Sequence, residues 1–145
     1  MAEPVRVLVV EDTVQIRMLI RLNLELEGHV VEEAADGDEA LLRLRDTSLP
    51  RPDVVTMDAI MEPRDGWTTL SDIRRDPALA DLPVVMVTAS VQAHQRARAR
   101  DIGVDALVAK PFEPTALVEV VEQLAASRRG PGGPGSSTAP TTLEG

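Results

Sequence analysis

Short apolar runs alternate with longer amphipathic segments along the chain. Five runs have the length of β-strands: residues 5–10, 30–34, 54–57, 84–87 and 106–109. The first, third and fourth are nearly continuous in Val, Leu and Met, which is typical of strands that are covered on both faces of a parallel sheet. We therefore expect helices on both sides of the sheet.

The segments between these runs show helical spacing. Thr13 can cap the first helix, Gly28 ends it, Pro114 stands near the start of the last, and Pro77 and Pro83 bracket a loop. Apolar residues that recur on one helical face are Ile16, Leu19, Ile20 and Leu24; Ala40, Leu41 and Leu44; and Leu117, Val118, Val121, Leu124 and Ala125.

Strands that alternate with helices predict one doubly wound α/β domain, with five parallel strands and about five flanking helices. We expect this domain to occupy residues 1–127, with a loosely packed, alanine-rich helix over residues 91–101. Residues 128–145 are mostly Gly, Pro, Ser and Thr, and this composition cannot form a core. They are interpreted as a disordered tail or linker, with a proline-rich docking segment as the alternative.

Composition and charge narrow the class of protein. The chain has 145 residues, 43% of them hydrophobic, but Trp67 and Phe112 are its only aromatic residues, so the core must be aliphatic. A formal net charge of -9 disfavours direct binding to nucleic acid. The chain has no cysteine, no signal-peptide pattern and no apolar run near the roughly 20 residues that span a bilayer. A cytoplasmic protein that is not inserted in the membrane is expected.

Polar residues stand at the ends of four of the five predicted strands. Glu11 and Asp12 follow the first strand, Asp58 the third, Thr88 the fourth and Lys110 the fifth. Each alone has an ordinary explanation, such as a helix cap, a strand threonine or a surface lysine. In doubly wound sheets, however, ligands bind outside the carboxyl ends of the strands. We therefore interpret the five residues as one site.

The residue types in this set favour phosphoryl chemistry. Three crowded carboxylates repel one another unless a cation lies between them or one takes up a proton. A cation is the simpler solution, and carboxylate, carbonyl and water oxygens suit Mg²⁺, which works alongside phosphoryl groups. Lys110 and Thr88 can contact phosphoryl oxygens, and Asp58 can be the nucleophile that becomes an aspartyl phosphate.

The motifs resemble those of response-regulator receiver domains, the phosphorylated half of a two-component signalling pair. The matching stretches, in order, are VLVVED, EAADGDEAL, PDVVTMD, DGW, PVVMVTA and GVDALVAKPF. The resemblance covers residues 5 to about 127 and implies the flavodoxin-like version of the doubly wound sheet, as a single domain.

The resemblance also implies a role for each site residue. Asp58 would be the phosphoacceptor, Asp12 a direct Mg²⁺ ligand, and Glu11 a ligand acting mainly through water, and the Ile60 carbonyl would complete the protein ligands. Thr88 would be the hydroxyl that moves to meet the phosphate. Lys110 would be the ion-pair partner of the phosphate, and the Lys110-Pro111 bond would be cis.

Two positions depart from the family pattern. The family usually has proline four residues after the phosphorylated aspartate, whereas this chain has Glu62 there and Pro63 next. The loop can follow another path, and Glu62 adds negative charge near the site. Leu107 stands where the family usually has Tyr or Phe, so ring rotation cannot report the switch.

The residues are compatible with three functions to different degrees. The leading one is a phosphorylated switch, which receives its phosphoryl group from a sensor histidine kinase, a phosphotransfer protein of a phosphorelay, or a small acyl phosphate. Phosphorylation would change a surface formed by the fourth helix, fifth strand and fifth helix. This surface would bind a downstream protein, or an effector domain if this chain is a fragment. The switch is compatible with homodimer formation as well. A phosphatase would need a general acid where Ile60 stands. The alternative is a phosphorylation-independent interaction module.

The remaining charged and histidine residues give weaker expectations. His29 and His94 are expected at the surface, away from carboxylate partners. Arg96, Arg98 and Arg100 are interpreted as a solvated face, with a basic strip for an acidic partner as the alternative.

Overall fold

Five parallel strands form one sheet, in the spatial order β2 (Val30–Ala34), β1 (Arg6–Val10), β3 (Val54–Asp58), β4 (Val84–Thr88) and β5 (Ala106–Ala109). The structure is a computed structural model that describes residues 3–62, 64–89 and 101–129. The strand order reverses between β1 and β3, which is where ligand sites lie in such sheets. The doubly wound parallel fold is confirmed.

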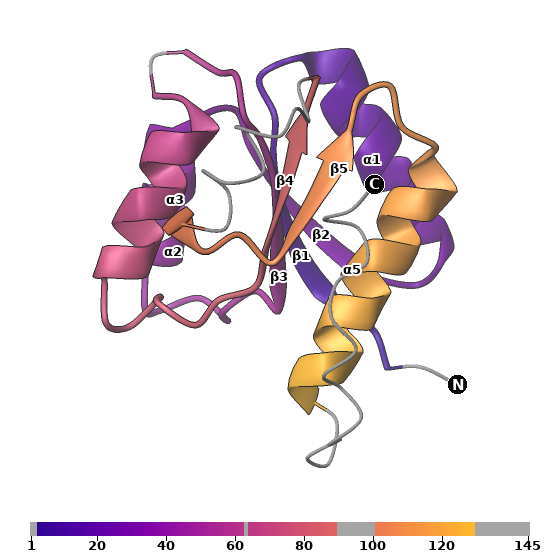
Figure 1. Cartoon of the computed structure of the whole chain (residues 1–145). Helices are drawn as coiled ribbons and strands as arrows, with labels where there is room; N and C mark the ends of the chain where they lie inside the picture. The colour runs from indigo at the N-terminus through magenta and orange to yellow at the C-terminus, as the bar shows by residue number, and fades with distance from the viewer. Residues whose placement is uncertain (1–2, 63, 90–100, 130–145) are drawn as a thin grey trace.

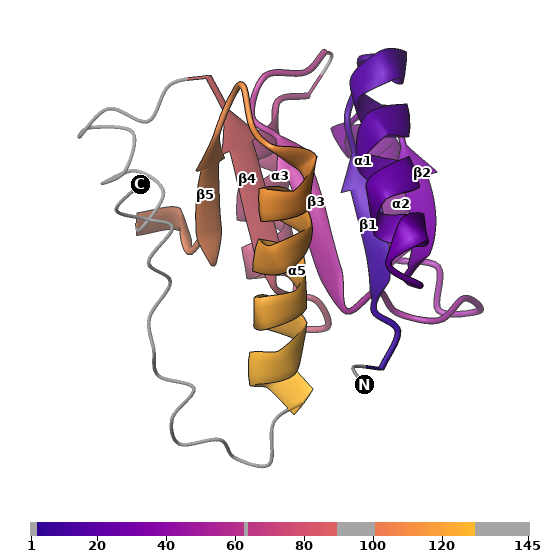
Figure 2. The same ribbon diagram turned by 90° about the vertical axis from the view of Figure 1, so that its right-hand side faces the viewer.

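Two helices cover each face of the sheet in the described part of the chain. Helices α1 (Val14–Leu26) and α5 (Pro114–Arg129) lie on one face, and α2 (Gly37–Leu44) and α3 (Gly66–Arg75) on the other, as Figures 1 and 2 show. Of the helix expected over 91–101, only Asp101 lies within the described residues. Of the tail predicted over 128–145, only Arg128 and Arg129 are described, and they belong to the end of α5.

The continuous apolar runs are explained by burial on both faces. Val7 and Val9 of β1 pack in the core on the α1 and α5 side, whereas Leu8 and Val10 pack in the core on the α2 and α3 side. Every residue of β3 and β4 is buried. The sheet therefore has a mostly aliphatic core on each side, but the buried Trp67 belongs to the core on the α2 and α3 side, so the expectation of a wholly aliphatic core is wrong there.

The predicted helix boundaries are largely confirmed. Pro114 is the first residue of α5, and Gly28, with a φ of 90°, adopts the left-handed conformation just after α1. Thr13 is the N-cap residue of α1, but its side chain makes no capping hydrogen bond. Asp36 and Asp65 cap α2 and α3 instead, through the Glu39 and Thr68 amides.

Two predictions of burial are wrong, because one residue expected in the core is exposed and one expected at the surface is buried. Leu19 is 44% exposed, because α1 meets the sheet along the row of Ile16, Ile20 and Leu24. His29 is buried, and its Nδ1 accepts a hydrogen bond from the Val5 amide at 3.0 Å.

The expectation that His29 lies away from carboxylate partners is also wrong, because the structure pairs it with Glu122. The His29 Nε2 lies 2.7 Å from Oε2 of Glu122 on α5. Because Nδ1 accepts a hydrogen bond from an amide, the ring proton is on Nε2, which donates a hydrogen bond to Glu122. The pair joins α5 to the amino-terminal ends of β1 and β2. His94 and the Arg96 to Arg100 run lie outside the described residues.

None of the helices in the described part of the chain combines the length and the hydropathy that a bilayer crossing requires.

Candidate functional site

The predicted site residues meet at the carboxyl edge of the sheet. Asp58 is the last residue of β3 and Thr88 the last of β4, and both are buried. Glu11 and Asp12 directly follow β1, with Glu11 2% exposed and Asp12 open to solvent. The Lys110 amide donates to the Thr88 carbonyl at 2.8 Å, so strand pairing brings Lys110 to the same edge.

Three carboxylates form a cluster at this edge. One oxygen of each of Glu11, Asp12 and Asp58 lies within 4.8 Å of the others. The Thr13 amide donates to Glu11 Oε2 at 3.1 Å, and the Ile60 amide donates to Asp58 Oδ1 at 3.2 Å. Main-chain donors thus orient two of the three carboxylates.

Lys110 brings a positive charge to the cluster. Its Nζ lies 3.1 Å from Asp58 Oδ2 and 3.6 Å from Glu11 Oε1. The Lys110-Pro111 bond is cis, as the resemblance implied. One ammonium group against three carboxylates leaves an excess of negative charge at the edge.

Burial, together with this excess of negative charge, changes the acidity of Glu11. Burial of the side chain, with the negative charge of Asp58 beside it, raises the pKa of Glu11 to about 7, although the Thr13 amide and Lys110 oppose the shift. Without a cation, therefore, the cluster holds a proton near neutral pH. A divalent cation would favour loss of that proton, because it attracts the ionised carboxylates.

The donor set fits a hard cation such as Mg²⁺. All three side chains offer carboxylate oxygens, and the exposed Asp12 leaves the cluster open to water. Ile60 belongs to the loop that follows β3, and its amide contact with Asp58 places this residue beside the cluster. The role of the Ile60 carbonyl as a ligand stays a prediction.

The start of α3 packs closely against the Asp58 backbone. The Gly66 amide donates to the Ala59 carbonyl at 2.9 Å, and a Cβ on Gly66 would lie 2.3 Å from the Asp58 carbonyl oxygen. Only glycine fits at this contact. The close packing of Gly66 at the start of α3 therefore helps to hold the chain that carries Asp58 in place.

The two departures from the family pattern differ in their setting. Leu107 is buried in the core on the α2 and α3 side, where it fills space as an aliphatic residue. Glu62 is exposed in the loop after β3, and Pro63 lies outside the described residues.

The sequence patterns did not predict one residue that contacts the site, Arg17. The Arg17 guanidinium on α1 donates to the main-chain carbonyl of Glu11 at 2.8 Å. Sequence patterns carry little signal for such a bond, because every residue offers the same main-chain acceptor.

The fold and this edge cluster define a doubly wound domain with an acidic site whose carboxylates fit a hard cation. A model of the response regulator receiver domain family matches residues 7–122, and the chain belongs to this family. Its members are phosphorylation-regulated switches of two-component systems.

Relatives and solved structures agree with this assignment. The probable transcriptional regulator ycf27 of Cyanophora paradoxa is 33% identical over 119 residues, which are 82% of this chain and 47% of that protein. The chain spans about half the length of the curated relatives it matches.

Two solved structures are similar over nearly the whole domain. Chemotaxis protein CheY4 of Vibrio cholerae has a TM-score of 0.77 and 27% identity, covering 84% of this chain and 99% of that one. The phosphorylated cyanobacterial phytochrome response regulator RcpA has a TM-score of 0.73 and 26% identity, covering 86% and 93%.

Proposed function

We propose that this domain accepts a phosphoryl group on Asp58, with Mg²⁺ held by Glu11, Asp12, Asp58 and the Ile60 carbonyl, and so switches a protein-binding surface. The observation that carries the proposal is the Lys110 ammonium group 3.1 Å from Asp58 Oδ2, beside a cluster of three carboxylates. A structural ion pair would need one carboxylate, not three.

Asp58 is the best nucleophile of the cluster. Its carboxylate is buried with one oxygen 3.1 Å from the Lys110 ammonium group, whereas the nearest Glu11 oxygen lies 3.6 Å from that group. Asp12 is open to solvent and suits a metal ligand. The similar RcpA was crystallised in a phosphorylated form, which supports the same chemistry here.

The reaction is a transfer between two carriers. An oxygen of Asp58 attacks the phosphorus of a phosphohistidine or acyl phosphate, the new O–P bond forms, and the bond to the leaving group breaks with its electron pair. Bound Mg²⁺ would neutralise charge on the phosphoryl oxygens. Lys110 holds a further oxygen by its charge, and the acyl phosphate stays on Asp58 until water removes it.

The switch would pass through Thr88 and Lys110. Their main chains are joined by a hydrogen bond of 2.8 Å at the ends of β4 and β5. A phosphoryl group on Asp58 would compete for Lys110 and offer an acceptor to the Thr88 hydroxyl, which changes the balance between two conformations of that edge.

Several partners follow from this chemistry. The proposed donor is a sensor histidine kinase or phosphotransfer protein in the cytoplasm. The proposed receiver of the signal is a downstream protein, or an effector domain if the chain is part of a longer protein. Phosphorylation-driven dimers are a further outcome to measure. Direct contact with nucleic acid is not proposed for this acidic domain.

A phosphorylation-independent interaction module is the second candidate, and the buried Leu107 favours it, because this position has no aromatic ring that could report the switch. Mass spectrometry separates the two. After incubation with acetyl phosphate and Mg²⁺, we expect one phosphoryl adduct on the wild-type chain, and none on Asp58→Asn or after chelation. No adduct on the wild type under any donor would support the module instead.

A further inference from the structure

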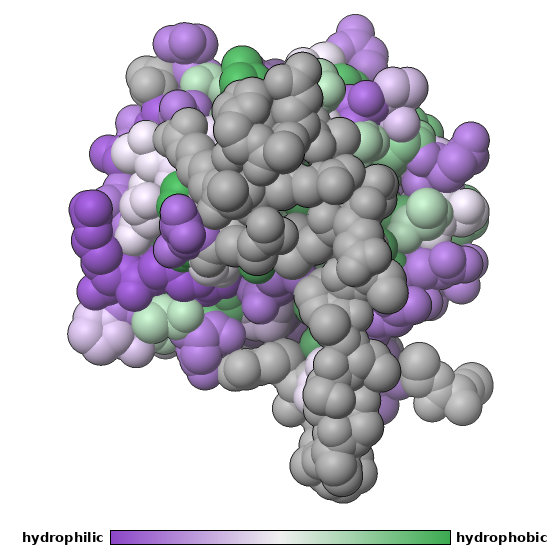
Figure 3. All heavy atoms as spheres, viewed as in Figure 1, coloured by the Kyte–Doolittle hydropathy of each residue, from purple (hydrophilic) through white to green (hydrophobic). Residues whose placement is uncertain are grey.

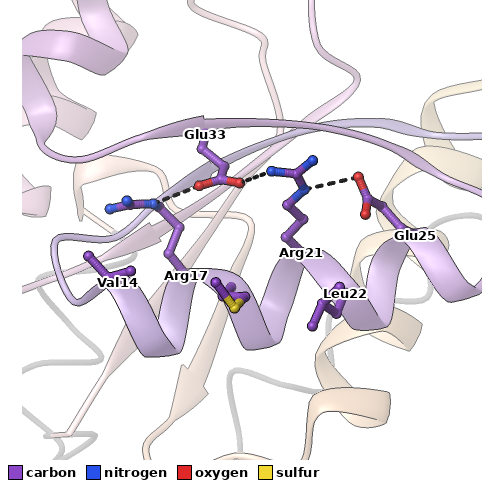
Figure 4. Close-up of a pocket in the computed structure, with 7 residues that line it drawn as sticks. Val14, Arg17, Arg21, Leu22, Glu25 and Glu33 are labelled. Atoms are coloured by element: carbon purple, nitrogen blue, oxygen red, sulfur yellow. Dashed lines mark hydrogen bonds and ion pairs between the residues drawn. The ribbon is translucent and has the colours of Figure 1, made fainter.

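Arg17 connects the acidic loop to strand β2. From α1, its Nη1 donates to the Glu11 carbonyl and its Nε donates to Glu33 Oε1, both at 2.8 Å. Figure 4 shows Arg17 and Arg21 directed at the same Glu33 carboxylate, and Arg21 also bonded to Glu25. These side chains line a pocket on the outer surface of α1.

The Glu11 carbonyl that accepts this hydrogen bond lies directly before Asp12 in the chain. It belongs to the planar peptide unit that joins Glu11 to Asp12. Holding its oxygen therefore holds the plane of that unit and the direction in which Asp12 leaves it. Asp12 is exposed, so little packing is available to orient it.

The rest of this loop is held by hydrogen bonds on both sides of that peptide. The Glu11 amide donates to the Ala34 carbonyl of β2 at 3.1 Å, and the Arg17 amide donates to the Thr13 carbonyl at 2.9 Å. The Thr13 amide donates to the Glu11 side chain. Arg17 thus contacts the loop twice, once through its main chain and once through its guanidinium.

Glu33 holds the guanidinium in place. Hydrogen bonds from Arg17, and then from Arg21, keep the pKa of Glu33 below its usual range, so its charge is present at neutral pH. Arg17, Glu33, Arg21 and Glu25 alternate in sign and sum to zero net charge. A neutral network orients Arg17 without adding to the negative charge of the cluster.

We propose that Arg17 is a positioning residue for the metal site: its guanidinium, oriented by Glu33, holds the Glu11–Asp12 peptide so that the Asp12 carboxylate faces the cation. This inference rests on the proposed Mg²⁺ function. A loop that is already ordered does not lose conformational entropy when the cation binds, which strengthens binding. Groups that orient metal ligands typically contribute 10- to 100-fold in affinity.

A purely electrostatic role of Arg17 predicts the opposite sign. Its positive charge repels a cation, so removing the charge alone should leave Mg²⁺ binding unchanged or make it tighter. Loss of positioning should make Mg²⁺ binding weaker. The direction of the change therefore decides between the two roles.

The test is calorimetric titration with MgCl₂ of the wild type, Arg17→Met and Arg21→Met. Methionine keeps much of the apolar stem and the helix propensity. We expect about tenfold weaker binding for Arg17→Met. For Arg21→Met, which removes the same charge but no contact with the loop, we expect a change below about twofold, since exposed charges are screened. Equal or tighter binding by Arg17→Met would overturn the proposal.

Two controls keep the outcomes distinct. If Arg17→Met fails to fold in a urea titration, Arg17→Lys replaces it, because lysine keeps the charge but cannot bond Glu33 and Glu11 through one planar group. Unchanged binding by Arg17→Lys would then overturn the proposal, and weaker binding would support it. If the wild type itself does not bind Mg²⁺, the proposed function fails and Arg17 has no such role.

Discussion

Lys110 Nζ lies 3.1 Å from Asp58 Oδ2, although Asp58 ends β3, Lys110 follows β5, and β4 lies between these two strands in the sheet. The contact forms because parallel strands end at one edge and Lys110 pairs with the Thr88 carbonyl there. It gives Asp58 a positive partner even without a cation. Lys110 therefore competes with a metal ion for the same carboxylate.

Lys110→Met should separate metal binding from phosphoryl transfer. Removing the ammonium group leaves the carboxylates with more negative charge, so Mg²⁺ should bind more tightly, by about fivefold for roughly 1 kcal/mol in this largely buried pair. Phosphoryl uptake from acetyl phosphate should become slower, because no lysine meets the transferred group. Calorimetry and intact mass measure the two effects. Weaker Mg²⁺ binding would show that Lys110 supports the cation site instead of competing with it.

Glu11 predicts an unusual pH dependence of stability. Its pKa is raised from 4.5 to about 7 in the folded chain, so the folded state keeps a proton that the unfolded state has lost. Without Mg²⁺, stability should therefore fall as pH rises from about 5 to 7, by up to about 3 kcal/mol from this group. Mg²⁺ binds the ionised form, so it should raise Tm more at pH 8 than at pH 5.

Glu11→Gln provides the matched control for this pH dependence. It keeps the size of the side chain but removes the titrating group, so the fall in stability between pH 5 and 7 should become smaller. Thermal unfolding with and without Mg²⁺ at each pH measures both effects. An increase in Tm that is equal at pH 5 and pH 8 would rule out the linkage to Glu11.

His29 should contribute to stability without affecting the site. His29→Leu leaves the Val5 amide without its acceptor, which should cost about 1–3 kcal/mol in urea unfolding. Glu122→Gln keeps the Val5 bond and should cost less. Mg²⁺ affinity should be unchanged in both variants, because His29 lies at the amino-terminal end of the sheet. A His29→Leu chain as stable as wild type would mean that the buried pair contributes nothing.

Much of the fold was predictable because the chain places apolar and polar residues in a consistent order. The five strands match the predicted runs to within one residue at each end, and β3 and β4 extend to include Asp58 and Thr88. The meeting of Glu11, Asp12, Asp58 and Lys110 followed from parallel strands that end at one edge.

The features that were missed depend on the tertiary structure. His29 and Glu122 are 93 residues apart, so no local pattern joins them. Arg17 bonds to a main-chain oxygen, which has no side-chain signature. Leu19 fits a helical repeat, but α1 buries a narrower row than that repeat suggested. In each case the partner is set by how the layers pack.

The identity of the residue that takes the phosphoryl group tests the account most directly. After reaction with acetyl phosphate and Mg²⁺, borohydride reduces an aspartyl phosphate to homoserine, which tandem mass spectrometry can place in the sequence. We predict homoserine at position 58 alone, and none when Mg²⁺ is chelated. Homoserine at another aspartate, or a phosphoryl group that forms equally well without Mg²⁺, would contradict the account.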